Sequence, residues 1–373
     1  MRIEIASIGN ELLLGNTINT NAAWIGRELA QRGFFVDRHS VFPDEKQAIR
    51  KGIEEALARA QLVLVTGGLG PTIDDLTRDA VEGLFPETAL SLKNSIGTAP
   101  GAFYFSKGKG LILLPGVPRE MEQMFLEEAL PVMERVFNPK KQYIHSFSLS
   151  LFKETEIDGY LIDLKQAHPE IECGIYPARG TLQIVLRSDQ PIDSVGKKLE
   201  EKFPTYVFPD RKIEEAVHRE LIARKKTLGL AESCTGGAIA ARLSAIPDAS
   251  YFLLGSIVAY SNDWKERFLN VAPETLSSQG AVSAATVEEM IEGIFSESKA
   301  EYAIAVSGIA GPGGGTIEKP VGTIYIGVGK RGERSDVGLI HAPKDRASAI
   351  DLSVQTSLCA LWRRLVHNTP TFS

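Results

Sequence analysis

The segment Glu232–Gly237 places a small hydroxyl residue where a nucleophile could work. It reads Glu-Ser-Cys-Thr-Gly-Gly and stands between an apolar run and a helical pattern, so Ser233 would lie at the mouth of a helix. Backbone amides at a helix start can form an oxyanion hole, which suits a serine that attacks a carbonyl carbon. Two alternatives stay open: Ser233 or Thr235 serves only as the N-cap of the helix, or the neighbouring Cys234 is the nucleophile.

A serine nucleophile requires a base, and a lysine is the candidate. None of the six histidines lies in a comparable glycine-rich loop, whereas Lys265 follows Tyr260 at the end of a predicted strand. A free lysine has a pKa near 10.4 and base catalysis favours about 7–8, so the pKa must fall by about 3 units, or about 4 kcal/mol. Only a shielded pocket would supply that shift. The alternative is a solvated lysine on a helix.

Ser307–Thr316 is a glycine-rich loop that follows the apolar segment 303–306. Five glycines within eight residues allow the backbone to fold around a ligand, and an anion is favoured because successive amides can point at it. A flexible linker is the alternative, but the loop lies between two predicted strands of the same block. We therefore expect it to bind a ligand.

A second glycine-rich segment, Thr66–Thr72, follows the apolar run 62–65. Its glycines allow close approach of a ligand, and amides at the start of the next helix could hold a phosphate. Asp74 and Asp75 follow it and could hold a hard divalent cation, or could be first-turn residues favoured by the helix dipole. A tight strand-to-helix turn without a ligand is the alternative for the whole segment.

Composition argues against several other classes of protein. The chain carries 41 Lys+Arg and 47 Asp+Glu, a net charge of −6, whereas general nucleic-acid binding needs a basic surface. The three cysteines form no Cys-x-x-Cys pair, and neither a Walker A motif nor a dinucleotide-binding glycine fingerprint occurs. No run approaches the ~20 apolar residues of a membrane span, and the N-terminus is unlike a signal peptide, so we expect a soluble cytoplasmic protein.

Three blocks of the chain must position these residues. Residues 1–137 alternate strand and helix patterns, which predicts an open, mostly parallel sheet with helices on both faces. Residues 138–209 predict a small α+β domain, and residues 210–373 predict a second α/β domain. The expected fold class is therefore α/β, with two three-layer α/β/α domains joined by a small α+β domain.

The whole chain resembles the CinA family of competence/damage-inducible proteins. Its last block is similar to the nicotinamide-nucleotide deamidase domain of that family, its first block to a molybdopterin-binding domain, and its middle block to a KH-type domain without the Gly-x-x-Gly loop of RNA-binding members. The motifs that carry the resemblance are Gly9–Leu13, Asn19–Asn21, Thr66–Asp75, Gly97–Gly101, Leu114–Met121, Ala231–Gly237, Tyr260–Asn262, Gly280–Ser283, Ser307–Pro312 and Lys319–Thr323.

For the last block the resemblance implies an amidohydrolase that converts nicotinamide mononucleotide and water to nicotinate mononucleotide and ammonia without a cofactor. It implies Ser233 as the nucleophile, Lys265 as the general base and Tyr260 as an aid to positioning or proton transfer. The other residues that it assigns to this site are amides near Thr235 and Gly236 for the oxyanion, and Ser307, Gly308, Ala310, Gly311 and Arg346 for the nucleotide.

For the first block the resemblance implies a second hydrolase, because some family members cleave ADP-ribose with a divalent metal such as Mg²⁺, Mn²⁺ or Co²⁺. The residues that it assigns are Gly67, Gly68, Gly70 and Thr72 for the pyrophosphate, and Asp74, Asp75 and Glu11 for the metal. Between Asp75 and Gly97 the chain is shorter than the family pattern, in a segment that would help to frame this site.

The family resemblance also implies a homodimer.

Two functions other than deamidation stay open. The first is a molybdopterin-related binding protein that acts through the first block and copurifies with a pterin. The second is a non-catalytic partner in DNA uptake or repair, which would keep its full biological function after the substitution Ser233→Ala.

Overall fold

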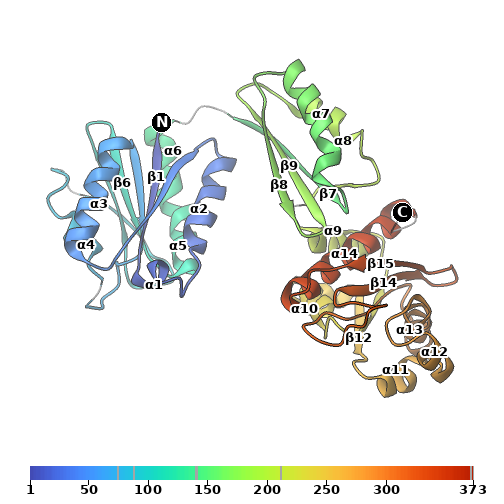
Figure 1. Ribbon diagram of the computed structural model, residues 1–373. Coiled ribbons are helices and arrows are strands. Elements are labelled where there is room, and N and C mark those ends of the chain that lie inside the picture. The colour runs from blue at the N-terminus through green and yellow to red at the C-terminus, as the bar shows by residue number, and fades with distance from the viewer. Residues whose placement is uncertain (74, 87–88, 139–141, 211, 370–371, 373) are drawn as a thin grey trace. The chain divides into compact units, whose positions relative to one another are not determined.

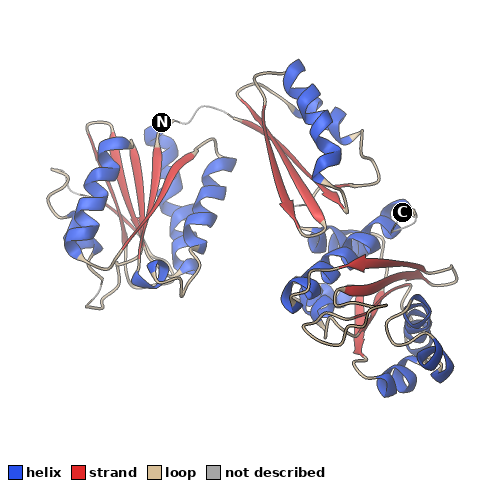
Figure 2. Cartoon of the chain, in the orientation of Figure 1, coloured by secondary structure: helices blue, strands red, loops and turns tan. Residues whose placement is uncertain are grey.

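The computed structural model describes the whole chain except residues 74, 87–88, 139–141, 211, 370–371 and 373. It divides into two compact units, Met1–Gln142 and Tyr143–Ser373. The first unit contains one sheet and the second contains two, each packed against helices (Figures 1 and 2). The expected α/β class is confirmed. None of the helices in the described residues is both long and apolar enough to cross a membrane.

A six-stranded sheet forms the centre of the first unit. Four strands run parallel, and the last two continue the sheet in antiparallel pairing at one edge. In order across the sheet they are β2 (Val36–Phe42), β1 (Ile3–Ile8), β3 (Leu62–Thr66), β6 (Lys109–Leu114), β5 (Gly101–Ser106) and β4 (Leu90–Leu92). All residues of β1 and β3 are buried, because a parallel sheet in the interior is covered on both faces.

Helices cover both faces of this first sheet (Figure 1). One hydrophobic core lies between the sheet and α2, α5 and α6, and the other lies between the sheet and α3 and α4. The helices are α1 (Asn10–Leu13), α2 (Thr20–Gln31), α3 (Lys46–Arg59), α4 (Thr77–Val81), α5 (Pro118–Met124), the π-helical turn η1 (Phe125–Ala129) and α6 (Leu130–Phe137). Because α4 begins only at Thr77, Asp75 lies before the helix and not in its first turn.

The second unit opens with a four-stranded antiparallel sheet. In order across the sheet the strands are β10 (Val207–Phe208), β7 (Tyr143–Ser150), β9 (Thr181–Ser188) and β8 (Glu172–Ala178). The helices α7 (Glu154–Ala167) and α8 (Asp193–Glu200) close a separate hydrophobic core with this sheet. The alternation of Leu182, Ile184 and Leu186 in the sequence matches their burial on one face of β9.

A mixed five-stranded sheet forms the rest of the second unit. In order its strands are β12 (Leu253–Val258), β11 (Leu228–Glu232), β13 (Tyr302–Gly308), β14 (Thr323–Lys330) and β15 (Asp336–His341). The first three are parallel and the last two are antiparallel. The helices are α9 (Ile213–Ala223), α10 (Ala238–Ser244), the 3-10 turn η2 (Ala249–Tyr251), α11 (Asn262–Leu269), α12 (Pro273–Ser278), α13 (Ala284–Glu297) and α14 (Arg346–His367). Helices α9, α10 and α14 share a core on one face, and α11, α12 and α13 share one on the other.

The segments singled out from the sequence follow the carboxyl ends of parallel strands in both units. Thr66 ends β3, which lies between β1 and β6, and Glu232 ends β11, which lies between β12 and β13. Open α/β sheets bind ligands outside this edge, so the topology places both candidate sites where the fold favours them.

Candidate active site

Ser233 stands directly after the buried strand β11, at the start of a tight turn into α10. Its backbone N–H donates to the carbonyl of Val306 at the end of β13 (3.0 Å), so the turn begins in register with the sheet. Gly236 and Gly237 then adopt positive φ angles of 60° and 97°, which glycine reaches without a steric cost. The side chain of Ser233 is thereby held at the sheet edge, with only 7% of the residue exposed.

The buried carboxylate of Glu232 fixes this turn to the helix that follows. It accepts hydrogen bonds from the backbone N–H groups of Gly237 (3.0 Å), Ile239 (3.1 Å) and Ala240 (3.0 Å), and from the hydroxyl of Ser256 (3.2 Å). The unpaired donors at the start of α10 are therefore satisfied by the protein itself. Sequence reasoning passed over Glu232, although a charged residue at the end of a buried strand was the available signal.

One of the amides expected at the oxyanion forms a hydrogen bond inside the same turn. Gly236 donates its N–H to the carbonyl of Ser233 (3.1 Å). Thr235 is buried, and neither Thr235 nor Gly236 is among the described residues that line the adjacent pocket. The Gly236 amide is thus used within the nucleophile turn. An oxyanion role for the amides near Thr235 stays a prediction.

Lys265 reaches Ser233 from the neighbouring helix α11. Its Nζ donates to Ser233 Oγ (2.9 Å) and to the carbonyl of Ala259 (2.7 Å), and only 1% of the residue is exposed. Burial disfavours the charged ammonium and lowers the pKa of Lys265 to about 8. This value lies at the upper end of the range set from the sequence, and it leaves an appreciable neutral fraction of Lys265 near physiological pH that can take the serine proton.

Cys234 is a poor competitor for the role of nucleophile. Only 5% of the residue is exposed, and burial raises the pKa of its thiol to about 12. The thiolate is the reactive form of cysteine, so a thiol with this pKa is almost entirely unreactive at neutral pH. Between the alternatives left open by the sequence, the structure favours Ser233.

A pocket of about 260 Å³ opens beside Ser233 and Lys265. Tyr260 lines it after β12, and Ala281 and Val282, which sequence reasoning did not select as site residues, line it between α12 and α13. The end of β13 and the glycine-rich loop that follows it supply residues 307–311, 313 and 314, which include the predicted Ser307, Gly308, Ala310 and Gly311. The hydroxyl of Ser307 donates to the carbonyl of Ala281 (2.6 Å), so it joins two walls of the pocket.

Arg346 brings a positive charge to this pocket from the first position of α14. Its Nη2 donates to the hydroxyl of Tyr260 (2.6 Å), and its Nη1 donates to the carbonyl of Gly311 (3.2 Å). Both acceptors are neutral, and the ion pairs between described residues do not include Arg346. The guanidinium is therefore positioned but not neutralised, as an anion-binding arginine must be.

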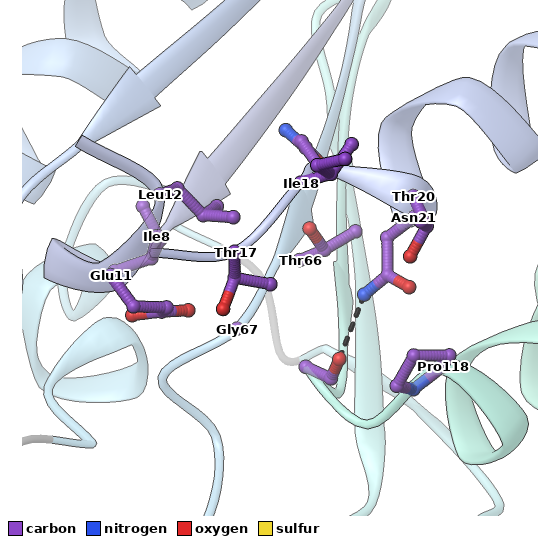
Figure 3. A pocket seen from close by; sticks show the side chains of 12 residues that line it. Ile8, Glu11, Leu12, Thr17, Ile18, Thr20, Asn21, Thr66, Gly67 and Pro118 are labelled. Atoms are coloured by element: carbon purple, nitrogen blue, oxygen red, sulfur yellow. Dashed lines mark hydrogen bonds between the residues drawn. The ribbon is translucent and has the colours of Figure 1, made fainter. Parts of the chain in front are cut away.

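The second candidate site is a smaller pocket of about 120 Å³ in the first unit. Figure 3 shows Glu11, Thr17, Thr66 and Gly67 around it, with a hydrogen bond from Asn21 Nδ2 to the carbonyl of Gly116 (2.8 Å) on its far side. Of the residues predicted here, Glu11 and Gly67 line the pocket. The other described ones, Gly68, Gly70, Thr72 and Asp75, are not among its lining residues, and Asp74 lies outside the described part of the chain.

Asp75 is bound to its own loop. Its carboxylate accepts hydrogen bonds from the backbone N–H of Thr72 (2.8 Å) and from the Thr72 hydroxyl. Burial acts to raise the pKa of Asp75, but the hydrogen bonds from Thr72 and Gly70 outweigh it and hold that pKa below its usual range. Within the described residues, no group of three or more His, Cys, Asp or Glu side chains could hold a metal ion. The metal site stays a prediction.

Comparison with known proteins supplies the family. Residues 210–365 match the family model described as the CinA C-terminal domain, and residues 4–135 match the one described as a probable molybdopterin binding domain. A putative competence-damage inducible protein of Moorella thermoacetica is 36% identical over 98% of this chain and 99% of its own length. The chain belongs to the CinA family. A CinA-like protein of Kosmotoga olearia is 35% identical over 88% of this chain and 90% of its own length.

Solved structures each cover less than half of this CinA-family chain. A CinA superfamily protein of Klebsiella pneumoniae is 38% identical, with a TM-score of 0.40, over 42% of this chain and 96% of its own. The molybdopterin biosynthesis enzyme MoaB of Thermus thermophilus is 24% identical, with a TM-score of 0.34, over 38% of this chain and 99% of its own.

The alignment with the Moorella protein spans 411 positions, whereas this CinA-family chain has 373 residues. At least 38 aligned positions therefore have no counterpart in the chain. The shortening expected between Asp75 and Gly97 agrees with this difference in length, and its place in the sequence stays a prediction.

Proposed function

We propose that the C-terminal domain deamidates nicotinamide mononucleotide to nicotinate mononucleotide, with Ser233 as the nucleophile and Lys265 as the base. The observation that carries the proposal is the 2.9 Å contact between Ser233 Oγ and the buried Nζ of Lys265. A serine paired with a lysine whose pKa has fallen to about 8 is an activated nucleophile. Membership of the CinA family supports the choice of a pyridine nucleotide as substrate.

The reaction follows from the positions of these two side chains. As Ser233 Oγ attacks the carboxamide carbon, neutral Lys265 takes the hydroxyl proton, and a tetrahedral intermediate forms. Collapse of the intermediate breaks the carbon–nitrogen bond, and the Lys265 ammonium returns the proton to the leaving ammonia. Water then attacks the serine ester with Lys265 again as the base, which releases the carboxylate and restores Ser233.

The rest of the pocket suits the phosphate of the nucleotide. Arg346 offers a guanidinium whose hydrogen bonds go to neutral acceptors, and the backbone of the glycine-rich loop lines the same pocket. Backbone amides and an arginine together are a common phosphate-binding set. The Tyr260 hydroxyl holds the guanidinium in place, which makes its role one of positioning Arg346.

The test measures products in a metal-free buffer that contains EDTA. The proposal expects ammonia and nicotinate mononucleotide in a ratio of one to one, and, after rapid acid quenching, a serine ester in the peptide that carries Ser233. No turnover of nicotinamide mononucleotide by the wild type would refute the proposal. Turnover without a covalent adduct in rapid-quench experiments, and with full activity of Ser233→Ala, would refute the serine mechanism alone.

For the N-terminal domain, metal-dependent cleavage of ADP-ribose remains a prediction from the family resemblance. The match to a probable molybdopterin binding domain supports binding of a small molecule at the pocket of Figure 3. Assays with ADP-ribose and Mg²⁺, Mn²⁺ or Co²⁺ distinguish a hydrolase from a pterin-binding domain, which would release a fluorescent pterin on denaturation. The homodimer is likewise a prediction, and light scattering measures it.

A further inference from the structure

The turn between β8 and β9 of the four-stranded sheet contacts the helix that begins with Arg346. Arg179 in this turn donates from Nη2 to the hydroxyl of Ser348 (2.7 Å) and from Nη1 to Oδ2 of Asp351 (3.0 Å). The carbonyl of the next residue, Gly180, accepts a weak hydrogen bond from the thiol of Cys359 (3.4 Å). The small sheet therefore bonds to α14 through side chains of that helix's first two turns and again further along it.

The first turn of α14 is the part of the helix that carries the pocket arginine. Asp345 caps the helix by accepting from the backbone N–H of Ser348 (2.8 Å), and Arg346 lies between these two residues. Ser348 is thus held from two sides, by the N-cap and by Arg179. The backbone of this turn carries Arg346, whose guanidinium reaches Tyr260 from it.

Asp351 extends the connection to the helix that follows the nucleophile turn. Its second oxygen, Oδ1, accepts from Nη2 of Arg242 in α10 (2.9 Å). Burial acts to raise the pKa of Asp351, but hydrogen bonds from Arg242 and Arg179 outweigh it and hold that pKa below its usual range. The carboxylate is therefore charged at neutral pH, and it links Arg179 to α14 and to α10, the helix after the nucleophile turn.

We propose that Arg179 is a positioning residue for phosphate binding by Arg346. By holding Ser348 and Asp351, it fixes the first turn of α14 and keeps the guanidinium of Arg346 aimed into the pocket beside Ser233. This role rests on the proposed function, because the phosphate is that of the nucleotide substrate. It assigns the small antiparallel sheet a part in substrate binding, although Arg179 is not among the residues that line the pocket.

The test separates binding from chemistry through the full-length variants Arg179→Ala, Arg179→Lys and Arg219→Ala. The side chain of Arg179 is 47% exposed, so its loss should leave the fold intact. Arg219 is the matched control, because it is 44% exposed and also pairs with carboxylates. We expect Arg179→Ala to raise KM for nicotinamide mononucleotide about fivefold, or about 1 kcal/mol, with kcat changed less than twofold.

The KM of Arg179→Lys should lie between those of the wild type and Arg179→Ala. An ammonium can reach one of the two acceptors, whereas the planar guanidinium reaches both. Arg219→Ala should keep the wild-type KM. An unchanged KM in Arg179→Ala, or equal losses of kcat in both alanine variants, would overturn the positioning role and leave the deamidase assignment intact.

Calorimetry with inorganic phosphate keeps the two proposals distinguishable. Binding of this probe needs no turnover, so it remains informative if the wild type fails to release ammonia. We expect Arg346→Ala to abolish phosphate binding and Arg179→Ala to weaken it about fivefold, with Arg219→Ala unchanged. Equal phosphate affinity in wild type and Arg179→Ala would contradict the positioning role whatever the outcome of the deamidation assay.

Discussion

The two pockets of this chain have the same position in their sheets but differ in the side chains brought to them. Each lies beyond the carboxyl end of a buried parallel strand, and each is entered by a turn that contains glycines with positive φ. In the C-terminal domain a second element, α11, brings Lys265 to within 2.9 Å of the turn's hydroxyl. In the N-terminal domain the acidic residue after the turn bonds to Thr72 in its own loop. A glycine-rich turn at a sheet edge thus indicates where a ligand binds, while the chemistry depends on what a second element delivers.

The difference is also electrostatic. Lys265 is buried with neutral hydrogen-bond partners, and burial lowers its pKa. Its amine can therefore exchange a proton near neutral pH. Asp75 accepts hydrogen bonds from its own loop, and they lower its pKa, so its carboxylate stays charged and takes up no proton near neutral pH. Shifts that make a group able to exchange a proton near neutral pH are typical of active sites, whereas a lowered carboxylate pKa also occurs in structural hydrogen-bond networks. The following experiments test this contrast.

The largest effect is expected for Ser233→Ala. Removing the nucleophile should lower kcat for deamidation by about 10⁴-fold or more, because the nearby Cys234 thiol is held in its unreactive protonated form by burial. Continuous ammonia detection measures this, with circular dichroism to show that the fold is retained. Equal activity of the variant and the wild type would remove Ser233 from the mechanism and make Cys234 the next residue to test.

Lys265→Met should lower kcat by about 10²–10⁴-fold, the usual range for loss of a general base. Methionine fills similar space without a buried amine, so the thermal midpoint should stay the same or rise. That combination separates a catalytic loss from a folding loss. Lys265→Arg is the matched charged variant, and it should be equally inactive because a guanidinium does not deprotonate at working pH. Retained activity in the arginine variant would contradict the role of Lys265 as a base.

The pH profile gives a further test of the same lysine. The base must be neutral, so kcat/KM should rise with pH while the amine loses its proton and level off above a pKa of about 8. Below that pH the rate should fall about tenfold per unit, as expected for one essential deprotonation. A profile of kcat/KM measured from pH 6 to 9.5, with folding checked at each end, tests whether Lys265 is this base. A flat profile over this range would exclude a lysine with a pKa of about 8 as the base.

The sequence allowed the candidate residues of the C-terminal site to be named, but it did not predict the contact between Ser233 and Lys265. The Glu-Ser-Cys-Thr-Gly-Gly turn and the Lys265 helix could each be placed at a strand end by local patterns. Their approach depends on β11 and β12 being neighbours in the sheet, which is a pairing between distant segments. The burial that sets the pKa of Lys265 depends on the packing of α11, and it is equally invisible in the sequence.

Two other features of the structure could not be predicted from the sequence, for similar reasons. Local spacing allowed Asp75 to be a first-turn residue of the next helix, but α4 begins later, at Thr77, and the carboxylate accepts hydrogen bonds from Thr72. Its role as a metal ligand stays a prediction. Arg179 gave no signal at all, because its partners Ser348 and Asp351 lie more than 160 residues away along the chain. Hydrophobic periodicity predicts the faces of helices and strands, whereas contacts between distant polar groups have no period to detect.

The smallest effect is expected for Asp75→Asn in the N-terminal unit. This substitution removes charge-assisted hydrogen bonds to Thr72, and after a discount for solvent screening it should lower the free energy of unfolding of the N-terminal unit by about 1 kcal/mol. Deamidation by the C-terminal domain should not change. Urea unfolding of the full chain measures the stability, followed by tryptophan fluorescence in a Trp264→Phe, Trp362→Phe background that leaves Trp24 in the N-terminal core.

The pH dependence of that loss gives its cause. The folded pKa of Asp75 is lowered, so its contribution is present at pH 7 and disappears as the pH falls through the folded pKa, where the carboxyl is protonated in both states. The stability difference between wild type and Asp75→Asn should therefore shrink below about pH 4. If adding Mg²⁺, Mn²⁺ or Co²⁺ instead stabilised the wild type and not the variant, Asp75 would be a metal ligand. The two pockets would then differ in chemistry, with each of them catalytic, and the contrast drawn from the loop geometry would fail.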